Sequence, residues 1–201
     1  MIQELSKIYY ALMDSYFKKE IQYKFRDKQY KFDVGNTLFS TFEMDHGTDV
    51  LLRAMTFDGP KSILDIGCGY GPLGIILAKV NPQAKVLMVD RDLLAARYSK
   101  QNAVKNGVEN VEVLGSVGLE AVGDQTFNLI VSNVPAKIGD QAITEEFILN
   151  PYRHLNSGGS LWIVVVNALN HLIPRVGSKN NLNMKLIKKR SGHSVYQIKK
   201  P

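Results

Sequence analysis

One stretch of the sequence decides the fold: Ser62-Ile-Leu-Asp-Ile-Gly-Cys-Gly-Tyr-Gly-Pro-Leu-Gly74. It opens with a short apolar run typical of a buried strand and continues into a turn with four glycines. A helical pattern follows over residues 73–80. Glycine lets the main chain turn sharply and approach a ligand, and the first turn of a helix presents free N–H groups. The stretch therefore predicts a strand, a ligand-binding turn and a helix, in that order.

The rest of the chain continues this alternation of strands and helices. Further strands are expected at 85–90, 111–114, 127–132 and 160–166, and further helices at 93–106 and 141–154. Residues 182–188 and 194–198 form a closing hairpin pattern around Ser191-Gly192. Such alternation predicts an α/β fold with a parallel sheet covered on both faces and ligands at the carboxyl ends of its strands.

A different pattern precedes this region. Residues 4–17 have apolar positions at helical spacing, and 21–25 and 30–34 alternate apolar and polar residues around the turn Arg26-Asp-Lys28, which predicts a hairpin. A helix is expected near 47–55, before the breaker Gly59-Pro60. We therefore expect an N-terminal helix and hairpin extension over 1–34 and one ligand-binding domain over 35–201.

Composition and charge narrow the class of protein. The 201 residues, 45% hydrophobic and 22% charged, suit a globular domain. The net charge of +6 comes from the last 31 residues, 171–201, which hold eight Lys/Arg and no acid. A smaller bias, six basic residues against two acids, spans Lys18 to Lys31. Such blocks favour binding of polyanions such as nucleic acid, with a merely solvated basic surface as the alternative.

Several classes are excluded by what the sequence lacks. The single cysteine, Cys68, forms no intramolecular disulfide or cysteine zinc cluster, and the four histidines lack metal-ligand spacing, so no metal is expected. The longest apolar run, Leu161–Val166, has six residues, too few for a membrane span. The N-terminal residues do not have the pattern of a signal peptide. A cytoplasmic protein is expected.

Two classes of cofactor compete for the glycine turn. Gly69-Tyr-Gly-Pro-Leu-Gly74 matches the dinucleotide pattern G-x-G-x-x-G, with Asp90 about 20 residues further on. However, the first glycine after the strand is Gly67, and counted from there the third glycine position falls on Pro72. The other pattern, D-x-G-x-G, begins at Asp65. In either case a carboxylate at Asp90, where the second strand ends, can accept both hydrogen bonds of a ribose diol.

The D-x-G-x-G pattern resembles motif I of the class I S-adenosylmethionine-dependent methyltransferases. That resemblance implies a Rossmann-like fold with a seven-stranded, mostly parallel sheet, helices on both faces and a C-terminal antiparallel hairpin. It also implies S-adenosyl-L-methionine as cofactor. The residues it places around the cofactor are Phe39, Thr48, Asp65, Gly67, Cys68, Gly69, Tyr70, Gly71, Asp90, Arg91, Ser116, Val117 and Asn133. A dinucleotide-dependent oxidoreductase is the less favoured alternative.

Asn133-Val-Pro-Ala136 follows the fourth strand of the domain and resembles motif IV, N-P-P-Y/F, of methyltransferases that act on planar exocyclic amines. Such an amine is a poor nucleophile until its N–H groups are bonded by a side-chain oxygen and a nearby carbonyl. The resemblance implies catalytic roles for Asn133 and Pro135 and substrate contacts for Ala136 and Lys137. Val134 replaces the first proline of the motif, and Ala136 replaces the aromatic residue that stacks on a base.

A second resemblance narrows the branch of the family. Gly35-Asn-Thr-Leu-Phe-Ser40 and Asp45-His-Gly-Thr48 are similar to the segment before motif I in the ribosomal RNA guanine-N2 methyltransferases. This implies methyl transfer to guanine N2 in ribosomal or other structured RNA, bound through 171–201 and Lys18–Lys31. Two alternatives stay open: a methyltransferase of this fold acting on a small molecule or protein, and an RNA- or cofactor-binding module without catalysis.

Overall fold

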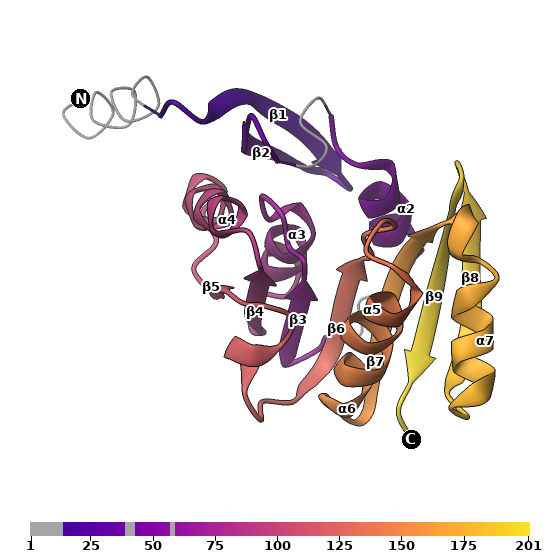
Figure 1. Cartoon of the computed structure of the whole chain (residues 1–201). Coiled ribbons are helices and arrows are strands. Elements are labelled where there is room, and N and C mark those ends of the chain that lie inside the picture. The colour runs from indigo at the N-terminus through magenta and orange to yellow at the C-terminus, as the bar shows by residue number, and fades with distance from the viewer. Residues whose placement is uncertain (1–13, 39–42, 57–58) are drawn as a thin grey trace.

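A seven-stranded sheet forms the centre of the molecule, with strand order β5-β4-β3-β6-β7-β9-β8 (Figure 1). The computed structural model describes residues 14–38, 43–56 and 59–201. Strands β3 to β7 are parallel, and β9 is antiparallel to both β7 and β8. The expected class I methyltransferase fold, with a mixed seven-stranded sheet and a C-terminal antiparallel hairpin, is confirmed.

The strands follow the sequence pattern closely. Their bounds are β3 Ser62–Ile66, β4 Lys85–Asp90, β5 Val111–Gly115, β6 Phe127–Asn133, β7 Leu155–Val166, β8 Asn183–Arg190 and β9 His193–Lys199. The order reverses at β3, whose neighbours are β4 on one side and β6 on the other. A crevice for ligands is expected at the carboxyl ends beside such a switch point. The glycine turn after β3 and Asn133 at the end of β6 therefore lie on the same edge of the sheet.

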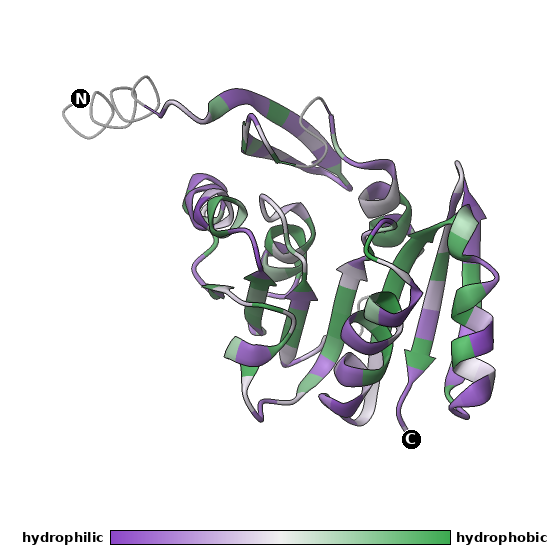
Figure 2. Cartoon of the chain, viewed as in Figure 1, coloured by the Kyte–Doolittle hydropathy of each residue, from purple (hydrophilic) through white to green (hydrophobic). Residues whose placement is uncertain are grey.

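Apolar side chains on the two faces of the sheet form two cores. On one face, Val131, Trp162 and Val164 belong to the same core as residues of α2 His46–Ala54, α3 Pro72–Val80 and α4 Leu93–Lys105. On the other face, alternate residues such as Ile130 and Ile163 pack beneath the remaining helices. These are α5 Asp140–Thr144, η2 Glu145–Leu149, α6 Asn150–Arg153 and α7 Leu172–Lys179, with the short turns η1 Glu120–Val122 and η3 Asn167–Leu169 beside them. Figure 2 shows the central strands mostly in hydrophobic colours.

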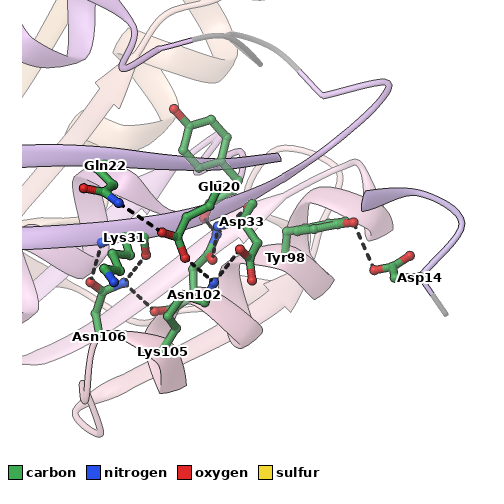
Figure 3. Close-up of polar contacts among 10 residues, drawn as sticks. Asp14, Glu20, Gln22, Lys31, Asp33, Tyr98, Asn102, Lys105 and Asn106 are labelled. Atoms are coloured by element: carbon green, nitrogen blue, oxygen red, sulfur yellow. Dashed lines mark hydrogen bonds and ion pairs between the residues drawn. The ribbon is translucent and has the colours of Figure 1, made fainter. Parts of the chain in front are cut away.

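The N-terminal hairpin consists of β1 Phe17–Phe25 and β2 Lys28–Gly35, as the alternating pattern predicts. Phe32 and Val34 are fully buried in the same core as α3 and α4. Polar contacts join the hairpin to α4 as well. Lys105 pairs with Glu20 and Asp33, and Asn102 of α4 and Asn106, which caps its C-terminus, bind the main chain of β2 (Figure 3). Figure 1 shows the hairpin beyond the carboxyl ends of β3, β4 and β6.

The structure differs from the expected elements at several places. The helix expected over 4–17 falls mainly outside the described residues, and its last residues are wrong: 15–16 form a turn and Phe17 begins β1. Strand β7 begins at Leu155, five residues early, and α7 was not predicted. The helix expected at 141–154 contains a π turn. In the described part of the chain, no helix combines the length and the apolar character that crossing a bilayer requires.

Candidate active site

The glycine turn after β3 forms one half of the site. Gly67, Gly69 and Gly71 all have positive φ, from +58° to +95°, which side-chain-bearing residues rarely adopt. At Gly69, a Cβ atom would meet no described atom within 4 Å, so this glycine borders open space. At Gly71, a Cβ would lie 2.8 Å from Ser99 Oγ. The turn is therefore packed against the protein at Gly71, and no described residue covers it at Gly69.

Asp90, at the end of β4, is bonded to this turn. Its Oδ2 accepts a hydrogen bond from the Gly69 N–H at 2.8 Å, and its Oδ1 accepts from the Asp92 N–H at 2.9 Å. Asp92 in turn caps α4 by accepting from the Leu94 N–H. A carboxylate oxygen can accept more than one hydrogen bond, so the half-buried Asp90 keeps acceptor capacity for a diol.

Asp65 is buried beneath the glycine turn, and its predicted role at the cofactor stays a prediction. Its side chain is 1% exposed, and Oδ2 accepts from the Gly74 N–H in the first turn of α3 at 2.8 Å. Burial raises the pKa of Asp65 to about 7, although the Gly74 bond opposes this shift. The acid therefore joins β3 to the N-terminal turn of α3, where the free N–H groups of a helix attract a carboxylate.

Cys68 and Tyr70 also turn their side chains inward. The Cys68 sulfur lies 3.5 Å from Ser99 Oγ, and burial raises the pKa of the thiol. The ring of Tyr70 packs edge-on against Phe32 of the hairpin, with 5.9 Å between centroids. The Tyr70 hydroxyl is the one buried side-chain polar atom of the described residues that has no hydrogen-bond partner among them. The predicted places of Cys68 and Tyr70 at the cofactor therefore stay predictions, and in this structure both side chains pack against the protein.

The loops after β4 and β5 form an apolar rim next to Asp90. Leu93 is 73% exposed and Val117 is 63% exposed, high values for large apolar side chains. A Cβ at Gly115 would lie 2.4 Å from Leu93 Cδ2, so Leu93 extends over the end of β5. Arg91 is exposed beside them. Sequence analysis missed Leu93, although its signal was present: an apolar residue at the solvent-facing start of α4.

Ser116 supports this rim instead of facing a ligand. Its hydroxyl donates to the Gly118 carbonyl at 3.1 Å and accepts from the Ala121 N–H at 3.1 Å. Its main-chain N–H donates to the Asp90 carbonyl at 2.8 Å. The hydroxyl is therefore bonded within the 116–121 turn and the residue is buried, while its predicted place near the cofactor stays a prediction.

Asn133 forms the other half of the site, and helix α2 holds it in place. Its Nδ2 donates to Asp45 Oδ1 at 2.5 Å and to Thr48 Oγ1 at 3.1 Å. A carboxylate can only accept, so these contacts fix which end of the Asn133 amide is the nitrogen. None of the described residues donates a hydrogen bond to the side-chain oxygen of Asn133, which lies at the carboxyl end of β6. Thr48, expected at the cofactor, is 4% exposed and contacts Asn133 instead.

The loop after Asn133 is open to solvent. Val134 is buried and its N–H donates to the Val164 carbonyl at 3.0 Å, while Pro135, Ala136 and Lys137 are exposed. The loop therefore presents an exposed methyl group, that of Ala136, at the position where the family motif has an aromatic ring. Phe39, the other expected cofactor contact, lies outside the described residues.

Comparison with known proteins identifies the family of this chain. Residues 29–197 match the model of the family described as methyltransferase small domain. The chain belongs to this methyltransferase family. It is 34% identical over 152 residues to the uncharacterized protein YbxB of Bacillus subtilis, a match that covers 74% of both chains. The family expected from motifs I and IV is thereby confirmed.

Two further proteins that this chain resembles are longer than the chain. The chain is 37% identical over 130 residues to ribosomal RNA small subunit methyltransferase C of Hahella chejuensis, which covers 63% of this chain and 37% of the relative. Among solved structures, a T. thermophilus 16S rRNA N2 methyltransferase, RsmC, in complex with AdoMet and guanosine has a TM-score of 0.80 at 23% identity. That superposition covers 94% of this chain and 52% of RsmC. The chain thus spans about half or less of these proteins.

The small-domain fold brings together Gly67, Gly69, Gly71, Asp90 and Asn133 at one edge of the sheet. Asp45 was part of the sequence motif but was not predicted as a site residue; its contact with Asn133 joins residues 88 positions apart, which spacing along the chain does not reveal. Within the described segments, no three or more His, Cys, Asp or Glu side chains cluster as metal ligands would.

Proposed function

We propose that this chain transfers a methyl group from S-adenosyl-L-methionine to the exocyclic N2 of guanine in ribosomal or other structured RNA. The observation that carries the proposal is the arrangement of Asn133. Asp45 and Thr48 hold its amide nitrogen, so its oxygen is presented as a hydrogen-bond acceptor at the same sheet edge as the open glycine turn.

The residues around the glycine turn fit the proposed cofactor. Gly69 leaves open space at the turn, Asp90 keeps acceptor capacity for the ribose hydroxyls, and Leu93 and Val117 offer an exposed apolar rim for a flat adenine ring. S-adenosylmethionine supplies an electrophilic methyl group on a positively charged sulfur. We assign Gly67, Gly69, Gly71, Asp90, Arg91, Leu93 and Val117 to its binding. Asp65, Cys68, Tyr70 and Ser116 support these residues from within the protein.

Asn133 prepares the acceptor amine. Its oxygen accepts one N–H of the amine, and a main-chain carbonyl of the 133–136 loop accepts the other. These two bonds favour a pyramidal nitrogen whose lone pair points at the methyl group, so catalysis is mainly orientation and electrostatics. Because Asp45 and Thr48 hold Nδ2, the Asn133 amide does not have to be ordered when the acceptor binds.

A charged track next to the site supports RNA as the substrate. Strand β8 ends with Lys188, Lys189 and Arg190, all exposed, and runs parallel to β7, so these cations lie at the same edge of the sheet as Asn133. Three strand spacings separate β8 from β6, roughly 14 Å. A phosphate of an RNA strand whose base lies at Asn133 can therefore reach these cations. We propose that 171–201, together with Lys18–Lys31 of the hairpin, binds the RNA backbone.

A small-molecule or protein amine is the second candidate acceptor. The observation that favours it is Ala136, an exposed methyl group where base-specific relatives of the fold have a stacking aromatic ring. Without a stacking aromatic ring, a smaller acceptor would lose less binding free energy than a base would.

Methylation of defined RNA tests the proposal. Unmodified 16S and 23S transcripts and salt-washed ribosomal subunits are incubated with S-adenosylmethionine that carries a labelled methyl group. The RNA is then digested, and the labelled nucleoside is identified by mass spectrometry. We expect N2-methylguanosine. Label in another nucleoside, or no label in any RNA while the protein binds S-adenosylmethionine, would contradict guanine N2 as the acceptor.

The variant Asn133→Ala provides the matched control. It removes the acceptor oxygen but none of the residues assigned to the cofactor, so turnover should be lost while the affinity for S-adenosylhomocysteine stays within twofold. A chain that only binds RNA or cofactor would show no turnover before or after the substitution, which separates that alternative from the enzyme.

A further inference from the structure

His193 lies on the same face and the same edge of the sheet as Asn133. It is the first residue of β9 and pairs with Val166 of β7, two residues beyond Val164. Val164 is the β7 partner of Asn133. Because side chains two residues apart on a strand share a face, His193 and Asn133 both project towards helix α2.

Gly47 of α2 lies between these two side chains. A Cβ atom on Gly47 would lie 3.1 Å from Asn133 Oδ1 and 3.1 Å from His193 Cδ2. The free oxygen of Asn133 and the imidazole edge of His193 therefore border the same small volume, from which a side chain at position 47 is excluded. Asp45 Oδ1, which holds the other end of the Asn133 amide, is 3.0 Å from the same point.

The imidazole of His193 is oriented by its own hairpin. Its Nδ1 lies 2.9 Å from the Ser191 carbonyl oxygen, which can only accept, so Nδ1 carries the proton of this bond. In the neutral ring Nε2 then has a lone pair and no proton. Cδ2, the atom nearest Gly47, is bonded to Nε2, so this acceptor is on the ring edge away from Ser191. The side chain is half-buried and keeps access to solvent.

We propose that His193 determines which base the enzyme accepts, by accepting the N1–H of guanine at Nε2 while Asn133 Oδ1 accepts from N2. This proposal rests on the proposed function and specifies how that site selects its substrate. Two acceptors side by side match guanine, whose N1–H and N2 amine are adjacent donors. In adenine and cytosine the ring nitrogen beside the exocyclic amine is an acceptor, which would leave two lone pairs facing each other.

Selection between bases depends on the free energy lost when a hydrogen-bond acceptor of the site is left without a donor. A site built to bond a substrate donor rejects an analogue that lacks it, because its own polar groups are left without a partner. His193 would therefore contribute more to discrimination between bases than to catalysis. It also contributes what the 133–136 loop lacks: with Ala136 in place of an aromatic ring, a second directional contact from β9 holds the base in position.

Another histidine of the chain offers a matched control. His154 has the same kind of bond from Nδ1 to a main-chain carbonyl, that of Gln125 at 2.7 Å. It lies before β7, at the opposite edge of the sheet from Asn133. The same substitution to alanine can therefore be compared at His193, which borders the acceptor site, and at His154, which does not.

The test is binding of nucleosides in the presence of saturating S-adenosylhomocysteine, measured by calorimetry. Imidazole nitrogen signals in ¹⁵N NMR spectra provide a second readout that does not require turnover. We expect guanosine to bind, to shift the His193 signals and to leave the His154 signals in place. Adenosine and cytidine should bind at least tenfold more weakly.

Three variants complete the test. His193→Ala should weaken guanosine binding about tenfold. A tenfold change in Kd corresponds to about 1.4 kcal/mol, which is the contribution of one hydrogen bond. His193→Gln should recover part of this loss because its amide oxygen is an acceptor, and His154→Ala should change nothing. Unchanged S-adenosylhomocysteine affinity and thermal unfolding would show that each variant is folded.

The failures are distinguishable. If guanosine binds but the His193 signals do not move, or His193→Ala keeps full affinity and selectivity, the role of His193 is overturned while guanine remains the acceptor. If adenosine or cytidine binds as tightly as guanosine, or no nucleoside binds, the proposed guanine acceptor is wrong and the role of His193 falls with it.

Discussion

The buried side-chain amide of Asn102 donates to the main-chain carbonyl of Tyr70, at 2.8 Å, and so supports the glycine turn from helix α4. The same amide nitrogen donates to the Asp33 carbonyl of the hairpin at 2.9 Å, and the amide oxygen accepts from the Asp33 N–H at 2.7 Å. One side chain therefore joins the N-terminal hairpin to the turn that we assign to the cofactor.

Replacement of Asn102 by Ala should weaken cofactor binding. The substitution leaves the Tyr70 carbonyl and the edge of β2 without a buried donor, at a cost of roughly 2–3 kcal/mol in unfolding free energy. The glycine turn should also lose order, and the Kd for S-adenosylhomocysteine should rise about tenfold. Calorimetric titration and chemical denaturation measure the two effects.

Asn106→Ala is the control for that prediction. Asn106, one helical turn further along α4, bonds the main chain of Lys31 in the same two-sided way but has no contact with the glycine turn (Figure 3). It should lower stability while leaving the affinity for S-adenosylhomocysteine unchanged. Equal losses of affinity in both variants would mean that the hairpin acts only through general stability.

Asp45→Ala should reduce turnover without changing the affinity for the cofactor. Asp45 holds the Asn133 amide and caps α2 by accepting from the Thr48 N–H at 2.9 Å. Without it the amide can rotate and present its nitrogen to the acceptor, and misorientation of this kind costs roughly 100-fold in rate. The measurement is kcat for methyl transfer beside the Kd for S-adenosylhomocysteine. His46→Ala, an exposed neighbour on α2, should leave both at the wild-type value.

Asp65 should make the protein less stable as the pH rises towards neutrality. In the unfolded chain its carboxyl ionises near pH 4, whereas burial in the folded protein raises its pKa to about 7. Between these values the folded state binds more protons than the unfolded state, so this group's contribution to stability falls with increasing pH, by up to roughly 4 kcal/mol.

Asp65→Asn isolates this effect. Asparagine keeps an oxygen for the Gly74 N–H but does not titrate, so the stability of the variant relative to wild type should rise from pH 4 to pH 7 and then level off. Denaturant unfolding at several pH values measures the difference, in which the other titrating groups cancel. A difference that does not change with pH would show that Asp65 is ionised in the folded protein throughout this range.

The cations at the end of β8 should account for much of the salt dependence of RNA binding. Replacing Lys188, Lys189 and Arg190 by Ala should lower affinity for a structured RNA and reduce the slope of log affinity against log salt by about 2 to 3. Lys61 and Lys85 are exposed at the amino ends of β3 and β4, the opposite edge of the sheet, and their replacement should have little effect. Equal effects of both sets would indicate non-specific attraction without a defined track.

The strands of the sheet could be predicted from the sequence because each one depends on a local run of apolar residues. Strand β3, from Ser62 to Ile66, and β4, from Lys85 to Asp90, have the bounds that their apolar runs predict. Helix α7 was missed because Pro174 and Gly177 interrupt its pattern. Pro174 is tolerated in the first turn, and Gly177 makes room for Met184, since a Cβ there would lie 2.9 Å from the Met184 methyl carbon.

The candidate site could be predicted from the sequence only in part. Glycine spacing, Asp90 and Asn133 identify the loops that meet at the carboxyl edge of the sheet. Sequence spacing does not show which side of a loop a side chain faces, and only the structure reveals that the side chains of Asp65, Cys68 and Ser116 are buried in the protein. Contacts such as that between Asp45 and Asn133 join distant parts of the chain and become visible only in three dimensions.

The position of α2 has a consequence for the order in which the molecule assembles. This helix is synthesised before every strand of the large sheet, yet the strands it covers, β6, β7 and β9, follow it by some 70 residues or more in the chain. Its apolar residues Val50, Leu51 and Leu52 therefore remain without these partners until the later strands have been synthesised. The acceptor site is completed at the same moment, so a nascent chain acquires catalytic competence only when its C-terminal hairpin has joined the sheet.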